Sequence, residues 1–335
     1  MKSHSFNALV VREDADGSFS RAVELRSIDE LPPGEVLVKV AYAGLNYKDA
    51  LSASGNKGVT RRYPHTPGVE AAGVVAESES ADFPPGMEVV AGGRDLGMNV
   101  PGGFGEYIRV PASWLLPLPA GVSMRDAAIY GAAGFTAAYS LIKIEDHGVS
   151  PEDGTVLVTG ATGGVGSIAV ALLARKGFTV AAATGKESEA PFLEKLGASR
   201  IVLRDKLDDR SGRPLGLERW AAVVDTVGGN ILATAIKQTK YGGIVTCCGN
   251  VAGAELASSV YPFILRAVTL TGIDSARCPV RVRNAVWERM ANDLALDCLD
   301  EIVDELSLEA LSDRIDLMLN GKIKGRTIVK HGHGE

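Results

Sequence analysis

In the first 120 residues, hydrophobic and polar positions alternate over short stretches that are separated by proline or glycine. Residues 35–40 follow a Pro-Pro-Gly turn and are mostly apolar. Short, punctuated runs of this kind are typical of β-strands, and three more lie at residues 73–76, 87–90 and 106–110. With few helical periods between them, these runs predict a β-rich, barrel-like unit.

The pattern changes near Ser123, where a serine precedes a helical run and can cap it. From there, strand-like and helix-like segments alternate. The expected strands are residues 155–159, 179–183, 200–203, 221–225 and 244–248, and the expected helices are residues 167–176 and 190–196. Alternation of this kind predicts a parallel, doubly wound sheet, so the chain is expected to be of the α/β class.

Beyond about residue 265 the chain departs from this alternation. Apolar residues recur at every fourth position from 282 to 294, which predicts one face of a helix. A second helix is expected at residues 308–319, with a glycine just after it as its C-cap, and a last strand at residues 326–330.

A predicted strand at residues 155–159 leads into a glycine-rich turn, which opens a helix. Dinucleotide sites need this arrangement, because the backbone must approach a pyrophosphate at the positive end of a helix. Gly163 is expected to let N–H groups approach the phosphates, and Gly166 to let the helix pack on the strand. Ala161 stands where the usual pattern has its first glycine. The alternative is a purely structural strand–helix turn. The cofactor contacts predicted in this turn are Thr162, Gly163, Gly164 and Val165.

The tip of the next strand distinguishes NADP from NAD. NAD sites usually place Asp or Glu about twenty residues beyond the glycines, where it binds the ribose hydroxyls. Here the strand ends at Thr184-Gly185-Lys186, and the first carboxylate is Glu187. A hydroxyl and an ammonium suit a 2′-phosphate, and Arg204 adds a second positive charge. We therefore expect NADPH; the alternative is that the two cations are solvated surface residues.

Composition and charge narrow the class of protein. The 335 residues are 46% hydrophobic and 23% charged, and they are ample for two domains. The net charge of −6 argues against broad surfaces for nucleic acid or acidic membranes. All four cysteines lie in the last third of the chain and form no evident disulfide framework. Because no signal-peptide or membrane-span pattern is recognised, we expect a cytoplasmic protein.

Several peptides resemble the medium-chain dehydrogenase/reductase superfamily: residues 32–38, 44–49, 67–70 and 132–137, and the glycine turn. Residues 45–51, 225–228 and 262–266 resemble its acrylyl-CoA reductase subgroup, also called quinone oxidoreductase of the YhdH/YhfP type. The resemblance implies a GroES-like β-barrel catalytic domain, an inserted Rossmann domain and usually a homodimer. The expected bounds are 1–124 and 266–335 for the catalytic domain and 125–265 for the NADP-binding domain.

The resemblance also raises the question of a metal. Zinc-dependent relatives carry Cys at the position of Asn46, together with a four-cysteine lobe. This chain has no cysteine before Cys247, and its early histidines, His4, His65 and His147, are poorly spaced for a metal. We expect a zinc-free protein in which His65 is a turn or pocket-wall residue.

Without a metal, the reduction of an activated C=C bond is still feasible. Hydride from NADPH attacks the carbon β to a carbonyl, and donors aimed at the carbonyl oxygen stabilise the developing charge. The predicted catalytic residues are Asn46, Tyr47 and Asp49. Asn46 can donate through its amide, and Tyr47 can donate or relay a proton and, by resemblance, lies beside the nicotinamide. Lys48 and Asp49 orient one another or the loop; alternatively, Asp49 is a helix N-terminal charge and Lys48 is solvated.

The resemblance adds further cofactor contacts. Asn250 and Ser275 follow strands and are expected to line the nicotinamide side; the alternative is that they only complete the ends of those strands. Ile264 and Arg326 are also expected to contact the cofactor. Because Cys247 and its neighbour lie in an apolar strand, they are interpreted as core packing.

We expect NADPH-dependent reduction of an α,β-unsaturated acyl thioester, acrylyl-CoA to propanoyl-CoA. The substrate would bring phosphates, and we hypothesise that Arg326 or a basic loop with Lys57, Arg61 and Arg62 meets them. The alternative for the loop is a charged surface. Rival activities are an NADPH:quinone oxidoreductase or a general enone reductase. A more distant rival is an NADPH-binding protein without turnover.

Overall fold

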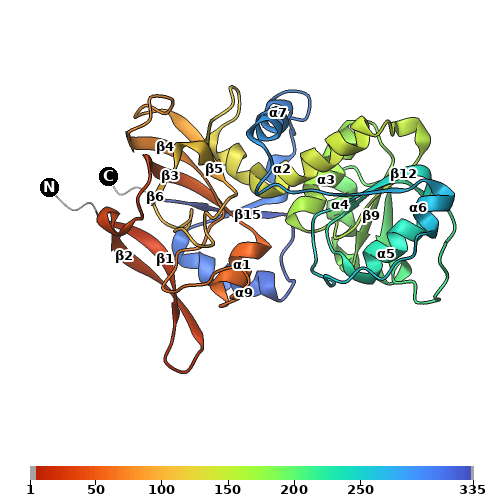
Figure 1. The fold of residues 1–335 in the computed structure, drawn as a ribbon, viewed down its shortest axis with the longest axis horizontal. Coiled ribbons are helices and arrows are strands. Elements are labelled where there is room, and N and C mark those ends of the chain that lie inside the picture. The colour runs from red at the N-terminus through yellow and green to blue at the C-terminus, as the bar shows by residue number, and fades with distance from the viewer. Residues whose placement is uncertain (1–4, 333–335) are drawn as a thin grey trace. The chain divides into compact units, whose positions relative to one another are not determined.

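The computed structural model describes residues 5–332 of the chain. The chain forms two compact units. Unit 1 comprises Met1–Ala132, Ala276–Pro279 and Val303–Glu335, and unit 2 comprises Ala133–Ser275 and Val280–Ile302. Both ends of the chain therefore belong to unit 1, and most of unit 2 is one continuous insertion (Figure 1).

Unit 1 contains a mixed sheet and a separate hairpin. Within the described residues, the sheet has seven strands in the order β14-β15-β3-β4-β5-β7, with β6 paired to β3. The long strand β3 pairs with β4 along one edge, and with β6 and β15 along the other. The strands are β1 (Ser5–Glu13), β2 (Phe19–Ser27), β3 (Val36–Leu45), β4 (Glu70–Ser78), β5 (Glu88–Gly92), β6 (Tyr107–Val110), β7 (Leu115–Pro117), β14 (Val303–Leu306) and β15 (Arg326–Lys330).

The core of unit 1 lies between this sheet and two helices, α1 (Tyr47–Ala53) and α9 (Leu311–Leu319), which contact each other. Val38, Phe104 and Ile315 are among its fully buried side chains. Each such side chain contributes roughly 1.5–3 kcal/mol through the apolar area it removes from water. The packed core holds the ends of β3, β4 and β15, where Asn46, Glu70 and Arg326 lie.

Unit 2 contains a parallel sheet. Its strand order is β10-β9-β8-β11-β12-β13, so the first strand, β8, lies in the middle and the order reverses between β8 and β11. Ligands of open α/β sheets bind at the carboxyl ends of the strands at such a reversal. The strands are β8 (Val156–Val158), β9 (Val180–Thr184), β10 (Arg200–Leu203), β11 (Trp220–Asp225), β12 (Thr239–Cys247) and β13 (Thr269–Gly272).

Helices pack on this sheet because their apolar faces match it. α3 contacts β8 and β9, and α5 contacts β11 and β12 (Figure 1). All three residues of β8 are buried, as expected for a strand covered on both faces. The helices of unit 2 other than α2 are α3 (Gly164–Arg175), α4 (Ala190–Lys195), α5 (Gly229–Gln238), α6 (Tyr261–Arg266), α7 (Val280–Ala291) and α8 (Leu299–Ile302).

Helix α2 (Met124–Asp146) contains residues of both units. Ser123 caps it, because its Oγ accepts a hydrogen bond from the N–H of Asp126 at 3.0 Å. Gly131 interrupts the helix with a φ of 46°. The helix is long and apolar enough to cross a membrane by length and composition, but 78% of its most apolar stretch is buried inside the protein. Burial of that extent is typical of a core helix.

The structure confirms the predicted α/β class and most predicted elements. The strands at 200–203 and 326–330 match β10 and β15 at both ends, and α3 begins three residues earlier than expected. The elements missed include the two strands of the β1–β2 hairpin, the strands β7, β13 and β14, and the helices α5, α6 and α8. β13 continues the parallel sheet beyond residue 265, where the sequence pattern departs from alternation.

Candidate functional site

The glycine turn of unit 2 connects β8 to α3. Gly160 has a φ of +58°, which favours glycine. A Cβ on Gly166 would overlap the carbonyl oxygen of Gly160, so only glycine lets α3 start so close to the strand. Gly163 is exposed, and a Cβ there would lie 3.3 Å from the same oxygen. The packing role predicted for Gly166 therefore agrees with the geometry.

The N-terminus of α3 is suited to an anion. Gly163 is its N-cap residue, and no side chain caps the helix. The N–H of Gly163 donates to Gly160 within the turn at 2.9 Å, so Gly163 provides space rather than a donor. The donors at the helix start are instead the N–H groups of Gly164 and Val165, which lie in the first turn of α3. Uncapped N–H groups at the positive end of a helix bind phosphate.

The tip of β9 lies beside that turn. The hydroxyls of Thr162 and Thr184 lie 3.4 Å apart, and Thr184 Oγ1 accepts a hydrogen bond from the N–H of Lys186 at 2.9 Å. The guanidinium carbon of Arg204 lies 3.0 Å from the position that a Cβ on Gly185 would take. Arg204 is exposed and directly follows the last residue of β10. The strand tip thus brings Thr184 and the cation of Arg204 together around a glycine.

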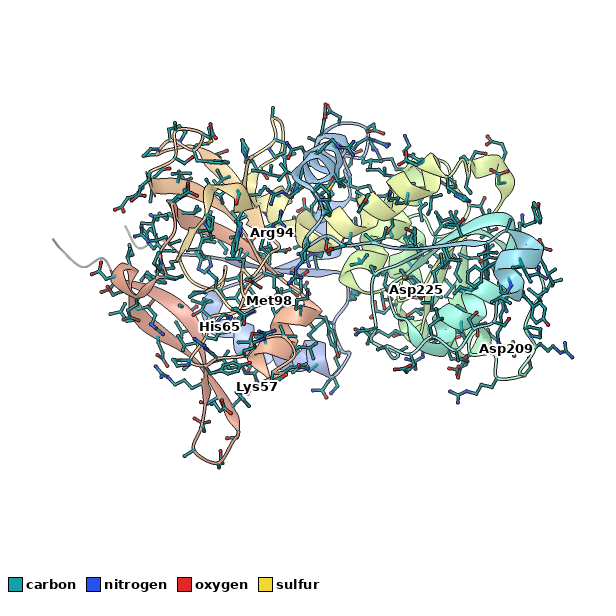
Figure 2. The ribbon with its side chains drawn as sticks, in the orientation of Figure 1. Lys57, His65, Arg94, Met98, Asp209 and Asp225 are labelled. Carbon is teal, nitrogen blue, oxygen red and sulfur yellow. The ribbon has the colours of Figure 1, made fainter. Side chains whose placement is uncertain are left out.

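A buried carboxylate organises the carboxyl ends of β8 and β11. Asp225 (Figure 2) accepts hydrogen bonds from Thr159 Oγ1 at 2.7 Å and from the N–H of Gly228 at 2.8 Å. Burial raises the pKa of Asp225, and these donors act in the opposite direction. Thr226 also donates to the carbonyl of Thr159 at 2.8 Å. The two strand ends at the reversal of the sheet are therefore held together by side chains.

In unit 1, the candidate catalytic segment lies at the start of α1. Asp49 is fully buried, and its carboxylate accepts N–H groups from Asn46 at 2.8 Å, Gly68 at 3.1 Å and Val69 at 2.8 Å. Burial raises the pKa of Asp49 to about 7. Because Asp49 has no exposed surface, the geometry supports the alternative role, in which it holds the start of the helix and the 67–69 turn.

The neighbouring side chains are more accessible. Tyr47 is 38% exposed, and Lys48 is exposed on the next position of α1. The side chain of Asn46 is partly buried and donates to the carbonyl of Gly44 at 3.3 Å. Of the predicted catalytic residues, Asn46 and Tyr47 are therefore able to meet a ligand.

Arg326 is placed differently from the expectation. Its side chain is only 1% exposed and pairs with Glu70 at 2.6 Å. It also donates to Asn46 Oδ1 at 3.1 Å and to three backbone carbonyls. A guanidinium has five N–H donors, and all five are used, so this arrangement leaves none for a cofactor or CoA phosphate.

The basic loop divides into two parts. Lys57 (Figure 2) pairs with Glu13 at 2.5 Å and lies over the rings of Phe19 and Tyr63 at 5.3 and 4.9 Å. These contacts tie Lys57 to the β1–β2 hairpin. Arg61 and its neighbour Arg62 are exposed and have no side-chain hydrogen bond or ion pair with the described residues.

The remaining predicted cofactor contacts lie in unit 2. Asn250 is exposed in the turn after β12, and its carbonyl accepts the N–H of Gly253 at 3.0 Å. Ser275 lies after β13 and is partly buried. Ile264 is 67% exposed on α6. The structure therefore places Asn250 at a carboxyl end of the sheet and Ile264 on a helix surface.

No metal site is found in the described part of the chain. Among residues 5–332, no three His, Cys, Asp or Glu side chains are grouped to hold a metal ion. Asn46 is not a zinc ligand, and the carboxylate of Glu70 is committed to Arg326 and to the N–H of Ala132. These residues do not fit zinc. His65 (Figure 2) lines a small pocket, as expected, and burial lowers its pKa. His4 lies outside the described residues.

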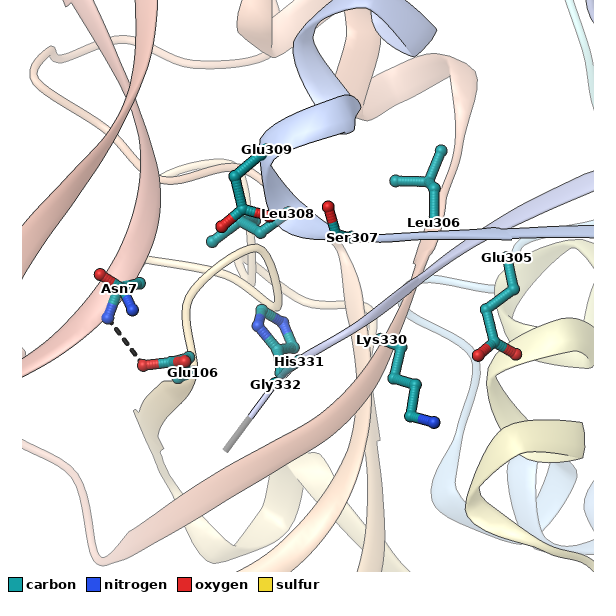
Figure 3. A pocket seen from close by; sticks show the side chains of 10 residues that line it. All are labelled: Asn7, Glu106, Glu305, Leu306, Ser307, Leu308, Glu309, Lys330, His331 and Gly332. Carbon is teal, nitrogen blue, oxygen red and sulfur yellow. Dashed lines mark hydrogen bonds between the residues drawn. The ribbon is translucent and has the colours of Figure 1, made fainter. Parts of the chain in front are cut away.

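A cavity of about 390 Å³ in unit 1 lies at the far end of β15 from Arg326 (Figure 3). Its walls include Glu106, Glu305 and Glu309, together with Lys330. Three carboxylates against one ammonium repel a phosphorylated ligand. The residues that line this cavity do not include Asn46 or its neighbours. Because of its charge, the cavity is also unsuited to an acyl-CoA.

Sequence reasoning missed the roles of two buried carboxylates. Glu70 was noticed only as part of a family peptide, and Asp225 only as part of another. Glu70 begins β4 and Asp225 ends β11, each next to a run of apolar residues, and both are buried. A buried charge needs a hydrogen-bond or ion-pair partner. The sequence pattern therefore predicts that each carboxylate has partners, but it does not identify them.

The chain matches two protein families. Residues 32–120 match the alcohol dehydrogenase GroES-like domain, and residues 164–292 match the zinc-binding dehydrogenase family. Acrylyl-CoA reductase AcuI of Ruegeria pomeroyi is 45% identical over 325 residues, which cover 97% of this chain and 98% of that protein. YhfP of Bacillus subtilis, whose name assigns it to the quinone oxidoreductases, is 46% identical over 326 residues, with the same coverage.

Solved structures are similar over the same length. The YhdH oxidoreductase of Salmonella enterica, in complex with NADP, has a TM-score of 0.94 and 43% identity, covering 97% of this chain and all of that one. The structure of Bacillus subtilis YhfP with NAD bound has a TM-score of 0.95 and 46% identity, covering 98% of this chain and 100% of that one. These similarities confirm the fold predicted from the sequence.

Proposed function

Since the chain belongs to the medium-chain dehydrogenase/reductase superfamily, in the group of the YhdH, YhfP and AcuI proteins, we propose that it is an NADPH-dependent reductase of α,β-unsaturated acyl thioesters. The proposed reaction converts acrylyl-CoA to propanoyl-CoA. The observation that carries the cofactor is the uncapped N-terminus of α3 beside a strand tip with an arginine and no acidic residue. The acyl-CoA substrate is supported by the name of the AcuI relative.

Five groups of this chain would hold the cofactor. The N–H groups of Gly164 and Val165 suit the pyrophosphate. The hydroxyl of Thr184 and the cations of Lys186 and Arg204 suit a phosphate on the adenosine ribose, because the hydroxyl donates a hydrogen bond and the cations add charge. From the sequence we propose residues 125–265 as the NADP-binding domain, and residues 1–124 and 266–335 as the catalytic domain. The parallel sheet of unit 2 extends the first of these beyond residue 265, to β13.

When bound, NADPH supplies the hydride that adds to the carbon β to the thioester carbonyl. The chain stabilises the charge that develops on the carbonyl oxygen. The amide of Asn46 is the proposed donor, because a preorganised donor at that oxygen lowers the barrier. Tyr47 is the proposed route for the proton to the α carbon, since its hydroxyl makes no hydrogen bond with the described residues. No zinc ion takes part in the proposed reaction.

The phosphates of CoA need cations at the surface. We assign them to Arg61 and Arg62, which are exposed and have no partner among residues 5–332, and not to Lys57, which is tied to Glu13. The double variant Arg61→Ala/Arg62→Ala is expected to raise KM for acrylyl-CoA about tenfold or more, since each lost contact costs about 1 kcal/mol. The variant Lys57→Ala is the matched control, and its KM should stay within twofold. An unchanged KM in the double variant rejects this assignment.

We also propose a homodimer formed by unit 2. β13 is at the edge of the parallel sheet, and an edge strand offers backbone groups to another chain. Large apolar side chains are exposed next to it: Val260, Tyr261, Ile264 and Leu265. Exposed apolar surface beside an unpaired edge favours a second copy of the same unit.

The test of function is initial-rate kinetics. Acrylyl-CoA, crotonyl-CoA and a benzoquinone are each supplied with NADPH and with NADH. The proposal expects the highest kcat/KM for acrylyl-CoA with NADPH, and a fall in kcat of at least tenfold in Tyr47→Phe. A higher kcat/KM for the benzoquinone assigns the protein to quinone reduction instead. No oxidation of NADPH with any acceptor rejects the enzymatic proposal.

A further inference from the structure

Arg326 is the centre of a saturated hydrogen-bond network in unit 1. Its side chain is buried at the start of β15. Nε donates at 2.8 Å, Nη1 at 3.1 and 3.2 Å, and Nη2 at 2.6 and 3.2 Å. The acceptors are the carbonyl oxygens of Ile129, Leu45 and Ala128, the side-chain oxygen of Asn46 and the carboxylate of Glu70. A buried guanidinium with every donor used has one fixed orientation.

Two glycines next to this network leave room for the side chains of Arg326 and Glu70. A Cβ on Gly44 would overlap both Glu70 Oε1 and Arg326 Nη2, and a Cβ on Gly131 would overlap the carboxylate of Glu70. Glu70 uses its second oxygen to accept the N–H of Ala132. Two glycines from different elements thus border the ion pair, and both oxygens of the acid are satisfied. The desolvation cost of burying both charges is offset only in such a complete arrangement.

The network determines how Asn46 presents its amide. A guanidinium has donors and no acceptor, so the atom of Asn46 that faces Arg326 is Oδ1. Nδ2 is therefore on the other side, where one of its hydrogens goes to the carbonyl of Gly44 at 3.3 Å. The second hydrogen of Nδ2 has no partner among the described residues. Without Arg326, the amide could rotate by 180° and present its oxygen instead.

We propose that Arg326 is a positioning residue, which fixes the Asn46 amide so that its nitrogen is the donor to the substrate carbonyl. This inference rests on the proposed function, because it gives the Asn46 donor its orientation. It replaces the contact with the cofactor, or with a CoA phosphate, that the sequence analysis expected of Arg326. A phosphate clamp requires unused N–H donors, and Arg326 has none in this arrangement.

Arg326→Lys tests the proposal. Lysine keeps the positive charge beside Glu70 but has three donors in place of five, so Asn46 loses its partner. We expect kcat with acrylyl-CoA to fall at least tenfold, while the Kd of NADPH, measured by fluorescence titration, stays within twofold. A phosphate clamp gives the opposite result: a Kd at least tenfold higher, with kcat retained at saturating NADPH. Thermal unfolding and active-site titration with NADPH give the folded fraction, and a retained kcat per folded molecule overturns the proposal.

Asn46→Asp provides a variant that keeps the contact with Arg326. A carboxylate of the same shape still accepts from Arg326, but it has no N–H. We expect kcat per folded molecule to fall at least tenfold, with the folded fraction measured as for Arg326→Lys. In the double variant with Arg326→Lys, kcat should be within threefold of that of the single variants, because both changes remove the same donor. Independent, multiplicative losses overturn the proposal.

A measurement without turnover separates this inference from the proposed function. In protein labelled with ¹⁵N-asparagine, the Nδ2 hydrogen of Asn46 that is bonded to the carbonyl of Gly44 should exchange with water at least tenfold more slowly in wild type than in Arg326→Lys. Equal exchange rates overturn the positioning role. If wild type binds NADPH but reduces no thioester, enone or quinone, the proposed function fails, and the exchange rates still decide whether Arg326 holds the amide.

Discussion

Replacing Arg204 should change the preference between NADPH and NADH, because its guanidinium lies where we propose that the phosphate on the adenosine ribose binds. Arg204 follows β10, which pairs in parallel with β9 so that Leu203 lies opposite Thr184. Its guanidinium carbon lies 3.0 Å from the position of a Cβ on Gly185. In Arg204→Ala, a 2′-phosphate at this strand tip loses its nearest guanidinium, whereas a cofactor without that phosphate loses nothing.

The expected change in the Kd of NADPH depends on how exposed Arg204 is to solvent. A hydrogen bond between charged groups contributes about 1.5–3 kcal/mol. Arg204 is exposed, and solvent screening brings its contribution toward the lower end of that range. A loss of about 1.5 kcal/mol corresponds to roughly tenfold in Kd. We therefore expect the Kd of NADPH to rise about tenfold and the Kd of NADH to change by less than about twofold.

The assay is fluorescence titration of both reduced nucleotides at low and high salt. The matched control is Arg200→Ala, because Arg200 is also exposed and begins the same strand, at the end away from the site. In the control, neither Kd should change, and in wild type the preference for NADPH should weaken as salt rises.

Two results would refute this reasoning. If Arg204→Ala weakened NADPH and NADH equally, the side chain would act on the fold of the strand tip and not on the phosphate. If wild type already preferred NADH, the absence of an acidic residue at this tip would not predict the cofactor. Neither outcome bears on the proposed pyrophosphate site at α3.

Three further predictions concern stability, packing and assembly. Since burial raises the pKa of Asp49 to about 7, its contribution to stability is complete below about pH 4 and is lost as pH rises through 7. The stability advantage of wild type over Asp49→Asn in urea unfolding should therefore shrink by about 3 kcal/mol between pH 5 and pH 8, and a constant difference would show an unshifted carboxyl. Gly166→Ala should destabilise the protein by about 1–3 kcal/mol, because the added Cβ overlaps the Gly160 carbonyl. Gly163 is exposed, so Gly163→Ala should weaken NADPH binding with little loss of stability. Equal melting temperatures of the two variants would contradict this prediction. Ile264→Asp should convert the proposed dimer to monomer in light scattering with the Kd of NADPH unchanged, and a raised Kd would instead make Ile264 a cofactor contact.

Local features of the fold were predictable from the sequence where one segment carries its own signal. The buried strand, the glycines and the helix of residues 155–176 are adjacent in the chain, so the packing role of Gly166 follows from the order of residues in that segment. Weak elements were missed. β2 has no fully buried residue and becomes a strand only through its pairing with β1. β13 has four residues and is recognisable only as an edge of the sheet.

The candidate site shows the same division. The sequence named Asn46 and Tyr47, because they stand together in one peptide, and the structure leaves both able to meet a ligand. It also named Asp49, yet its complete burial against three backbone N–H groups depends on the 67–69 turn, which is distant in sequence. Exposure is a property of the packed chain, so no pattern within the peptide could separate Asp49 from its neighbours.

The sequence alone determined the alternation of strands and helices, the glycine turn and the missing acidic residue at the tip of β9, because these depend on neighbours along the chain. Only the tertiary structure decided the partners of Arg326, which lie 256 residues away at Glu70 and 280 residues away at Asn46. A buried charge must find a partner, since leaving it unpaired costs several kcal/mol. Which partner it finds is set by the sheet that brings β15, β3 and β4 side by side.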